Sequence, residues 1–201
     1  MYEMDKIKPA PPEWGADSLR RRENRLLQLL GELFQTAIIA ILLFIAINLV
    51  TARIRVEGIS MEPSLHDEQF LVVNRLAYRW KEPQRGDIII FRFPSDPKRR
   101  FIKRVIGLPG DVVAVRDGQL YINGVVLDEP YITEAHQYHG EWRLSPYEVF
   151  VLGDNRNNSS DSQNWGPLHI DEIIGKAVFV YWPLETMGVI QHYDLVVAAE
   201  K

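Results

Sequence analysis

The longest apolar run of the chain lies near its N-terminus, at residues 33–50. These 18 residues carry no charged side chain and consist mostly of Leu, Ile, Ala and Phe. As an α-helix they extend roughly 27 Å, which is close to the hydrocarbon thickness of a bilayer. The pattern predicts a transmembrane anchor helix, which we place at residues 26–52.

Residues 1–25 are polar and show no apolar period, and a Pro-rich stretch at residues 8–12 disfavours a helix. We expect a loose tail, disordered to about residue 18. Four arginines at positions 20, 21, 22 and 25 precede the apolar run, whereas only Arg53 and Arg55 follow it closely. This imbalance predicts a cytoplasmic or stromal N-terminus, with residues 53–201 on the extracytoplasmic or lumenal side.

A buried core helix, which would normally be shorter and show a polar face, is one alternative explanation of the same run, and a cleavable signal peptide is the stronger one. Val50, Thr51 and Ala52 form a segment that fits a cleavage site for small residues. The long polar N-terminus and the length of the apolar run favour an uncleaved anchor instead. The lipid bilayer is then a partner, either a plasma membrane or a thylakoid membrane.

After residue 52 the pattern changes to short runs of β-branched and aromatic residues, separated by Gly, Pro, Asn and Asp. This is typical of strands joined by turns. Asp117-Gly118 and Asn123-Gly124 flank one run, as expected for successive hairpins. The fold class predicted is mainly β, with few helices after the anchor and a mostly antiparallel domain. The runs lie at residues 70–73, 87–93, 112–115, 120–122, 149–152 and 173–182.

Composition excludes several classes of chemistry. The 201 residues include 27 acidic and 23 basic side chains, and the net charge of -4 argues against a nucleic-acid partner. There are no cysteines, which excludes disulfides, thiol catalysis and cysteine-bound zinc. The sequence offers no cluster of metal ligands, so we expect neither a metal nor an organic cofactor. It does not indicate an oligomeric state.

Three segments of the β region could carry chemistry. Ser60 lies in a Pro-bearing turn, Lys103 lies among apolar residues, and a ten-residue polar loop occupies positions 153–162. A serine hydroxyl needs a base to become a useful nucleophile. A lysine can be that base if apolar burial lowers its pKa toward neutrality, and hydroxyls of the polar loop could hold the neutral amine. An ordinary exposed lysine is the alternative reading of Lys103.

Histidine is the commoner base for a catalytic serine, so a Ser-His-Asp triad has to be considered. None of the histidines lies in a recognisable catalytic setting, and the G-x-S-x-G pattern is missing around Ser60. We expect surface or interface roles for all five. They are His66, His136, His139, His169 and His192.

A second serine–lysine pair is present at Ser95 and Lys98, with the S-x-x-K spacing of penicillin-binding proteins. That motif works because a helix places both side chains on one face. Pro94 and Pro97 predict a loop here, and the partner motifs of those enzymes are missing. We interpret the match as chance.

Four motifs, taken in their order along the chain, resemble the type I signal peptidases, the bacterial leader peptidases and their organellar relatives. Each motif alone could arise by chance, but four in family order after an apolar helix are very specific. The matches are S-M-x-P-[ST]-L at residues 60–65, R-G-D-[IV]-[IV]-x-F at 85–91, K-R-[VI]-x-G-[LM]-P-G-D at 103–111, and G-D-N-R-x-N-S-x-D-S at 153–162.

This resemblance implies a Ser/Lys endopeptidase with a coiled antiparallel β-sheet, closed into a partial barrel. Ser60 would attack the scissile carbonyl, while neutral Lys103 would take its proton and then protonate the leaving amine. Ser159 would orient the lysine amine, and Asp161 would brace the site through an ion pair with Arg104. A turn-capping serine and a surface salt bridge are the alternatives for these supporting residues.

The resemblance also implies the substrates, which are exported preproteins cut after an Ala-x-Ala signal. Small side chains one and three residues before the cut would enter shallow apolar pockets, which give modest discrimination per methylene. The substrate would bind as an extended strand beside the site. The pocket residues implied are Met61, Leu65, Phe101 and Ile102.

Three departures from the family pattern matter. Gly58 replaces a serine that helps bind the oxyanion in some relatives, so stabilisation would depend on the Ser60 backbone N–H and possible further main-chain donors. Gln163 replaces an arginine of some relatives, which leaves Arg104 as the expected partner of Asp161. Only about 40 residues separate residue 111 from residue 153, so the large accessory β domain of some relatives is absent or minimal.

Two other functions share parts of the pattern. A repressor-type Ser/Lys self-cleaving protein would need a DNA-binding domain and a self-cleavage site, where this chain has an apolar helix. A non-enzymatic membrane-tethered β adaptor would leave the joint presence of Ser60, Lys103, Ser159 and Asp161 unexplained. Cleavage of an added precursor separates both from a signal peptidase.

Overall fold

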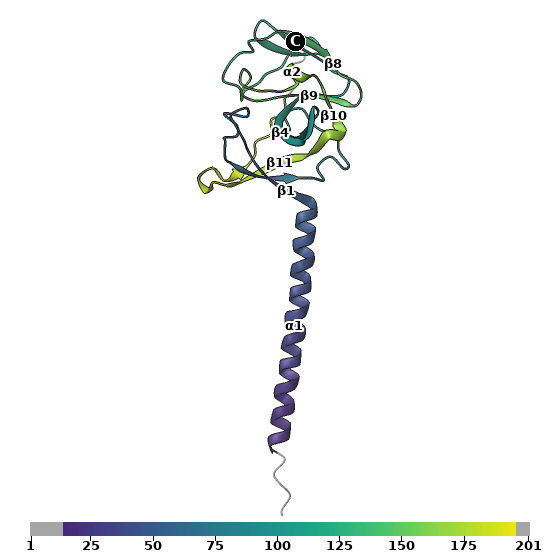
Figure 1. Cartoon of the computed structure of the whole chain (residues 1–201), viewed down its shortest axis with the longest axis vertical. Coiled ribbons are helices and arrows are strands. Elements are labelled where there is room, and N and C mark those ends of the chain that lie inside the picture. Colours follow the sequence, from purple (N-terminus) through teal and green to yellow (C-terminus); the bar gives the residue numbers. More distant parts are fainter. Residues whose placement is uncertain (1–13, 196–201) are drawn as a thin grey trace, which may run out of the picture. The chain divides into compact units, whose positions relative to one another are not determined.

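The computed structural model describes residues 14–195, with side chains from residue 27 onward. Within the chain, residues 1–47 and residues 48–201 form two compact units. Figure 1 labels the long helix and several elements of the second unit. The predicted mainly β fold class is confirmed, because one long helix is followed by two antiparallel sheets.

The long helix α1 (Trp14–Val50) has 37 residues. Its segment Leu27–Val50 is long and apolar enough to cross a membrane, and every side chain in that segment is exposed. The helix begins well before residue 26 because Ala, Leu, Arg and Glu, all good helix formers, continue the apolar run toward the N-terminus. It ends at Val50, two residues before the predicted end. The rest of the predicted polar tail, residues 1–13, lies outside the described residues.

The larger sheet has eight strands, and all its pairs are antiparallel. Its order is β1 (Thr51–Arg55), β2 (Phe70–Asn74), β11 (Ile173–Trp182), β3 (Ile88–Phe93), β4 (Asp96–Gly107), β9 (Glu148–Leu152) and β10 (Leu168–His169), with β12 (Gly188–Val189) paired to β11. Short helical turns α2 (Ser162–Trp165), η1 (Ile170–Glu172) and η2 (Leu184–Thr186) connect its later strands.

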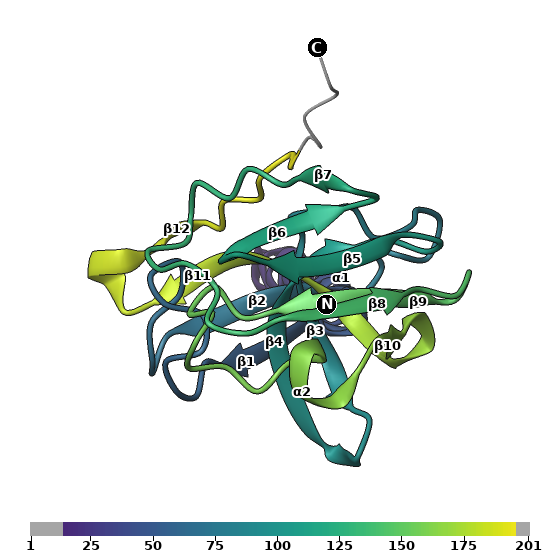
Figure 2. The same ribbon diagram turned by 90° about the horizontal axis from the view of Figure 1, so that it is seen from above.

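The smaller sheet has four strands, β7 (Val125–Val126), β6 (Gln119–Ile122), β5 (Val112–Arg116) and β8 (Gly140–Arg143), in that order. Figure 2 shows it beside the larger sheet. An apolar cluster joins the two sheets, because Val113 and Leu120 pack in the same core as Phe150 of β9. The predicted hairpin turns are confirmed: Asp117-Gly118 and Asn123-Gly124 both have positive φ at each residue, the geometry that suits two-residue hairpin loops.

All six predicted strand runs are found, as β2, β3, β5, β6, β9 and β11. The 12-residue strand β4 was not predicted, because Pro97 and the charged residues at positions 96 and 98–100 hide its alternation. Strand β3 explains why a continuous apolar run can still be a strand. Ile88 and Ile90 pack in one core cluster while Ile89 and Phe91 pack in another, so both faces of β3 are buried.

Candidate active site

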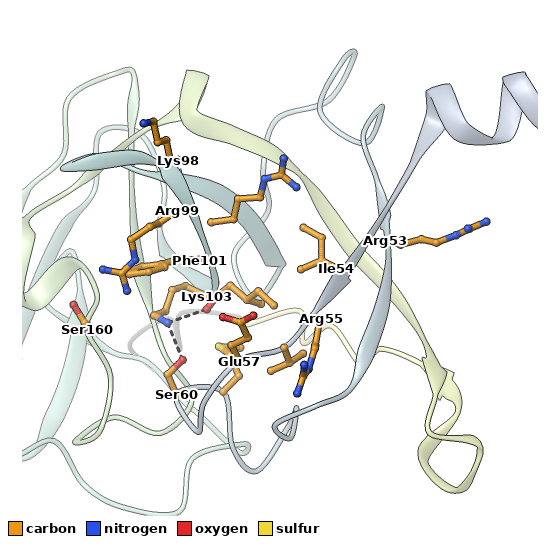
Figure 3. A pocket seen from close by; sticks show the side chains of 14 residues that line it. Arg53, Ile54, Arg55, Glu57, Ser60, Lys98, Arg99, Phe101, Lys103 and Ser160 are labelled. Carbon is orange, nitrogen blue, oxygen red and sulfur yellow. Dashed lines mark hydrogen bonds between the residues drawn. The ribbon is translucent and has the colours of Figure 1, made fainter.

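Ser60 and Lys103 meet in space although 43 positions separate them in the sequence. The Lys103 Nζ atom lies 2.9 Å from Ser60 Oγ and donates a second hydrogen bond of 2.9 Å to the Ile102 carbonyl. Figure 3 shows both interactions as dashed lines. The Lys103 side chain is buried, with only 4% of the residue exposed. A serine oxygen and a lysine nitrogen are therefore in hydrogen-bond contact, the arrangement that a nucleophile and its base require.

The surroundings of Lys103 favour the neutral amine. Burial lowers the pKa of Lys103 to about 8, although the carboxylates of Asp161 and Asp154 act in the opposite direction. Lys103 forms no salt bridge with any residue that the structure describes. Its ammonium lies 5.4 Å from the centre of the Phe101 ring. A lysine with this pKa has a substantial neutral fraction at mildly alkaline pH and can accept a proton.

The turn that carries Ser60 is held by the polar loop 153–162. Asn155 donates from its backbone N–H to the Ser60 carbonyl (3.1 Å) and from its side-chain amide to the Ile59 carbonyl (3.2 Å). On the other side of the serine, Gly58 adopts a positive φ of 84° and donates its N–H to Asp67. We did not predict a role for Asn155; its only signal in the sequence is its place inside the polar loop.

Gly153 allows this loop to approach the serine closely. A Cβ atom built on Gly153 would lie 2.3 Å from Ser159 Oγ and 2.4 Å from the Ser60 carbonyl oxygen. Both contacts are too short for any side chain, so position 153 requires glycine. The same geometry places the Ser159 hydroxyl beside the backbone of Ser60.

Two polar groups next to the serine lack a partner within the described residues. The Ser159 Oγ atom is buried and makes no hydrogen bond of good geometry, Lys103 included, although its hydroxyl lies near enough to the Asp161 carboxylate to lower the pKa of that group. The Ser60 backbone N–H likewise donates no hydrogen bond in this part of the chain. Buried polar groups usually find partners, and unpaired ones at a reactive site are available to a substrate or an intermediate.

The predicted ion pair between Arg104 and Asp161 is wrong. Arg104 binds Asp154 instead, from Nε to Oδ1 (2.8 Å) and from Nη2 to Oδ2 (2.6 Å). The reason is the alternation of β4: Lys103 and Arg104 leave opposite faces of the strand, so a group beside Lys103 cannot also meet Arg104. Both partners of the Arg104–Asp154 pair are completely buried.

Asp161 has a different task in the structure. Its carboxylate accepts hydrogen bonds from the backbone N–H of Gly153 (3.0 Å) and of Gln163 (3.2 Å), and it caps the short helix α2. Burial raises the pKa of Asp161. Gln163 does not ion-pair, and its side-chain amide donates to the Arg156 carbonyl. Asp161 therefore holds both ends of the segment that carries Ser159.

A second buried ion pair supports the same loop from the far side. Arg156 donates two hydrogen bonds to the carboxylate of Glu129, at 2.5 and 2.7 Å. Burial alone would raise the pKa of Glu129, but Arg156 and His136 hold it at about 2. Arg104 and Arg156 both lie over the ring of Tyr131. The polar loop is thus braced by two arginine–carboxylate pairs.

Ser60 and Lys103 line a groove of about 650 Å³, which we call the Ser60 groove. Met61, Phe101 and Ile102 line it as predicted. Leu65 does not, because it is buried in the core cluster that also contains Met61. The lining residues are Arg53, Ile54, Arg55, Val56, Glu57, Ser60, Met61, Lys98, Arg99, Arg100, Phe101, Ile102, Lys103 and Ser160.

Two strand edges facing this groove are open. Strand β1 pairs only with β2, and residues 96–103 of β4 pair only with β3, because β9 joins β4 from Arg104 onward. Both segments line the Ser60 groove. An extended peptide in the groove could therefore add to either edge through its main chain.

The alternative bases do not reach the serine. None of the five histidines lines the Ser60 groove; His136, for example, is buried against Glu129 and Arg156. Ser95 lies in the turn between β3 and β4, and Lys98 lies on β4 rather than in the loop that we predicted. No helix joins Ser95 to Lys98. Within residues 14–195 no group of three or more histidine or acidic side chains is placed to hold a metal ion.

Comparison with known proteins identifies relatives. The family model "Signal peptidase, peptidase S26" matches residues 30–182. The chain is 39% identical over 167 residues to the probable signal peptidase I-2 of Synechocystis sp., covering 79% of this chain and 76% of that protein. It is 37% identical over 187 residues to signal peptidase I of Leptolyngbya laminosa, covering 89% and 90%.

A plant protein is similar over a shorter share of its length. Thylakoidal processing peptidase 1 of Arabidopsis thaliana is 37% identical over 172 residues, which covers 80% of this chain but 51% of the plant protein. The relatives thus come from bacteria and from a chloroplast.

Proposed function

The chain belongs to the type I signal peptidases of family S26, and on that premise we propose that it cleaves preproteins after Ala-x-Ala with a Ser60/Lys103 dyad. The observation that carries the proposal is the 2.9 Å contact between Lys103 Nζ and Ser60 Oγ, made by a buried lysine whose pKa is lowered to about 8. Membership of the family supports the reaction class, which is signal-peptide cleavage by a membrane-anchored endopeptidase. The mechanism proposed below is argued from the residues of the site.

In the first step, Ser60 Oγ attacks the scissile carbonyl while its proton passes to the neutral amine of Lys103. The oxyanion that forms is stabilised by the Ser60 backbone N–H, which has no partner in the described part of the chain. The Lys103 ammonium then protonates the leaving amine and releases the mature protein. In the second step Lys103 takes a proton from water, whose oxygen attacks the acyl-serine, and the Lys103 ammonium then returns the proton to Ser60 Oγ as the signal peptide leaves.

Ser159 and Asp161 act on the lysine in this proposal. The Ser159 hydroxyl, buried and unpaired beside Ser60, hydrogen-bonds the amine when Lys103 gives up or gains its proton. Asp161 fixes the loop that carries Ser159. Replacing Ser159 by Ala should lower kcat/KM by about 10- to 100-fold, the value of one hydrogen bond to a charged group, and Ser159→Thr should restore part of it. A Ser159→Ala variant as active as the wild-type protein would show that Ser159 has no role in the mechanism.

Specificity for Ala comes from the walls of the Ser60 groove. Met61 and Ile102 are at least nine-tenths buried, so the pockets they form beside Ser60 are shallow and apolar. The extended substrate pairs with the open edges of β1 and β4, and its alternate side chains, at one and three residues before the cut, point into these pockets. Phe101 contributes its half-buried ring to the same wall.

The test is cleavage of an Ala-x-Ala preprotein by the detergent-solubilised full chain. We expect wild-type protein to cut after the second Ala and Ser60→Ala and Lys103→Met to lose the activity. Ser95→Ala and Lys81→Met, which alter an exposed serine and an exposed lysine elsewhere, should keep wild-type rates. Full activity of Lys103→Met would overturn the assignment of the base.

We further propose a cytoplasmic or stromal N-terminus, with residues 53–201 on the other side of the membrane. The arginines at positions 20–25 support this orientation. Because the chain has no cysteine, a single cysteine placed at Ser95 gives an unambiguous label. We expect an impermeant maleimide to label that cysteine in intact right-side-out vesicles. Labelling only after the vesicles are lysed would show that the orientation is the opposite of the one proposed.

A further inference from the structure

The Ser60 groove is strongly basic in a chain that is acidic overall. Six of the 14 residues that line the groove are lysine or arginine and only Glu57 is acidic, whereas the whole chain has a net charge of -4. Clefts lined by one sign of charge concentrate ligands of the opposite sign. The groove is therefore expected to attract negatively charged groups.

Most of the excess charge lies on one strand. Arg55 is paired with Glu68 at 2.7 Å, and Arg53 points away from Ser60 (Figure 3). The three consecutive cations of β4, at positions 98–100, are exposed and form no salt bridge with any residue between positions 27 and 195. We call these three, Lys98, Arg99 and Arg100, the β4 cations.

The β4 cations lie along the same open edge that ends at Lys103. Residues 96–103 pair with β3 on one side only, so a peptide added to the free edge would pass each of them. Arg99 is held in place by the rings of Phe93 (5.9 Å) and Phe101 (5.2 Å). Figure 3 shows Arg99 beside Phe101, with Lys103 and Ser60 below them.

The substrate positions that face the β4 cations follow from the way an extended peptide would align with strand β4. Neighbouring extended chains advance together at roughly 3.3 Å per residue. In the function proposed above, Phe101 and Ile102 contact the side chains one and three residues before the cut. The β4 cations extend the same strand away from Ser60, so they face residues about four to six positions before the cut.

We propose that the β4 cations form a subsite for an aspartate or glutamate four to six residues upstream of the scissile bond. The inference depends on the proposed function, because it uses the same groove and the same direction of the substrate. Exposed ion pairs contribute little individually, so we expect a preference of about twofold to fivefold for the acidic substrate in kcat/KM. Salt should weaken it, since exposed charges are screened over about 8–10 Å at physiological ionic strength.

Phosphate groups of anionic lipids offer charge of the same sign, but the structure favours the peptide. The β4 cations line the hollow that contains Ser60, and they lie on a strand edge without a partner strand, which a peptide can use and a lipid cannot. Lipid binding is therefore an outcome that the experiment must be able to report.

The experiment measures kcat/KM of the full chain in neutral detergent for matched preproteins. Each carries Asp at position four, five or six before the cut, and its partner carries Asn there. We expect the Asp substrate to be favoured at one or more of these positions, with the preference lost in about 0.5 M salt. The same exchange placed two to four residues after the cut should have no effect. A preference only on that side would overturn the proposed subsite.

Variants identify the cations responsible. Arg99→Gln/Arg100→Gln should reduce the Asp-to-Asn ratio to about one. Arg99→Glu/Arg100→Glu, which changes the charge of the three positions from +3 to -1, should instead favour a substrate with Lys over one with Gln at the same position. The matched control is Arg79→Gln/Lys81→Gln, which removes two exposed cations outside the groove and should keep the wild-type ratio. If the control variant lowers the Asp-to-Asn ratio as much as the groove variant does, the preference depends only on the net charge of the protein, and the proposed subsite is wrong.

The outcomes separate this inference from the function on which it depends. If wild-type protein cuts the Asp and Asn substrates equally, the subsite is wrong and the Ser/Lys endopeptidase stands. If neither is cut, the proposed function fails first. If the groove variant loses activity equally on both substrates, and only in vesicles that contain phosphatidylglycerol, the β4 cations bind lipid and the substrate subsite is wrong.

Discussion

Lys103 and Arg104 are neighbours on β4, but their side chains leave opposite faces of the strand and enter different surroundings. Arg104 is completely buried, forms a two-point ion pair with Asp154 and lies between the rings of Tyr131 and Tyr193. Lys103 is almost as buried and has no ion pair, only a serine hydroxyl and a carbonyl. The charge of Arg104 is compensated by a carboxylate in direct contact, whereas Lys103 has no such contact, and its burial lowers its pKa although Asp161 and Asp154 act in the opposite direction.

This difference shows how one strand can stabilise the fold through one face and carry a candidate catalytic residue on the other. Burial lowers the pKa of a lysine that forms no direct ion pair, whereas an arginine stays charged in any surroundings, so a buried arginine needs a carboxylate partner. The Arg104 face binds the loop that carries Ser159 and Asp161, and the Lys103 face meets Ser60 in the open groove. The following predictions exchange or remove the features that distinguish the two faces.

The largest effect is expected from Lys103→Arg. A guanidinium stays protonated at any working pH, so it cannot take the Ser60 proton. Loss of the base should lower kcat by at least about 10⁴-fold, as removal of one member of a catalytic serine centre does. Lys103→Met, which cannot ionise, should be equally inactive. Turnover of a preprotein checks this, and an active Arg variant would contradict the comparison.

Arg104→Met should act mainly on stability, because it leaves Asp154 buried without a partner. Breaking a buried pair in this way costs about 3–5 kcal/mol. Guanidinium unfolding of the full chain in detergent measures it. The double variant Arg104→Met/Asp154→Leu should recover much of the loss, since no charge then stays buried alone. A double variant as unstable as the single one would show that the ion pair itself supplies the stability.

Lys103→Met is expected to stabilise the fold in a pH-dependent way. The folded pKa of about 8 lies below the ordinary value of 10.5, so the folded state is penalised for holding the ammonium. The penalty is complete below pH 8, about 3 kcal/mol, and disappears as pH rises past 10.5. The gain of the Met variant over wild type should therefore be largest at neutral pH and fall toward zero above about pH 10.5. A constant gain across that range would contradict the lowered pKa.

The smallest effect is expected at an exposed pair. Arg116 and Glu141 form a 2.8 Å salt bridge with 64% and 39% of their side chains exposed. Arg116→Gln should change the free energy of unfolding by less than about 1 kcal/mol and leave kcat/KM unchanged. The same measurement serves as the reference for Arg104→Met. A loss comparable to that of Arg104→Met would mean that burial does not decide the strength of these pairs.

The sequence predicts much of this architecture from local pattern. The apolar period located the long helix, Asp117-Gly118 and Asn123-Gly124 located two hairpins, and six strand runs were found in place. The start of α1 and the strand β4 were missed for opposite reasons. Good helix formers extended the helix beyond its apolar part, and the β4 cations masked a strand whose alternation becomes apolar only after Arg100.

The supporting contacts of the site were harder to predict because they depend on which face of a strand each residue leaves. The motifs placed Ser60 and Lys103 together, and the structure has them in contact. They suggested Asp161 as the partner of Arg104, but the alternation of β4 sends Arg104 to Asp154. The loop contacts of Asn155 and the Arg156–Glu129 pair join segments 20 or more residues apart, and no local pattern reports such contacts.

The most direct test of the central claim, that Lys103 is a neutral general base, is the pH dependence of kcat/KM for an uncharged Ala-x-Ala substrate. This quantity reports the pKa values of the free enzyme. We predict that kcat/KM falls tenfold per pH unit below a midpoint of about 8, the pKa of Lys103. A midpoint near 6.5, the ordinary histidine value, or a rate that does not change between about pH 6 and pH 10, would contradict the account.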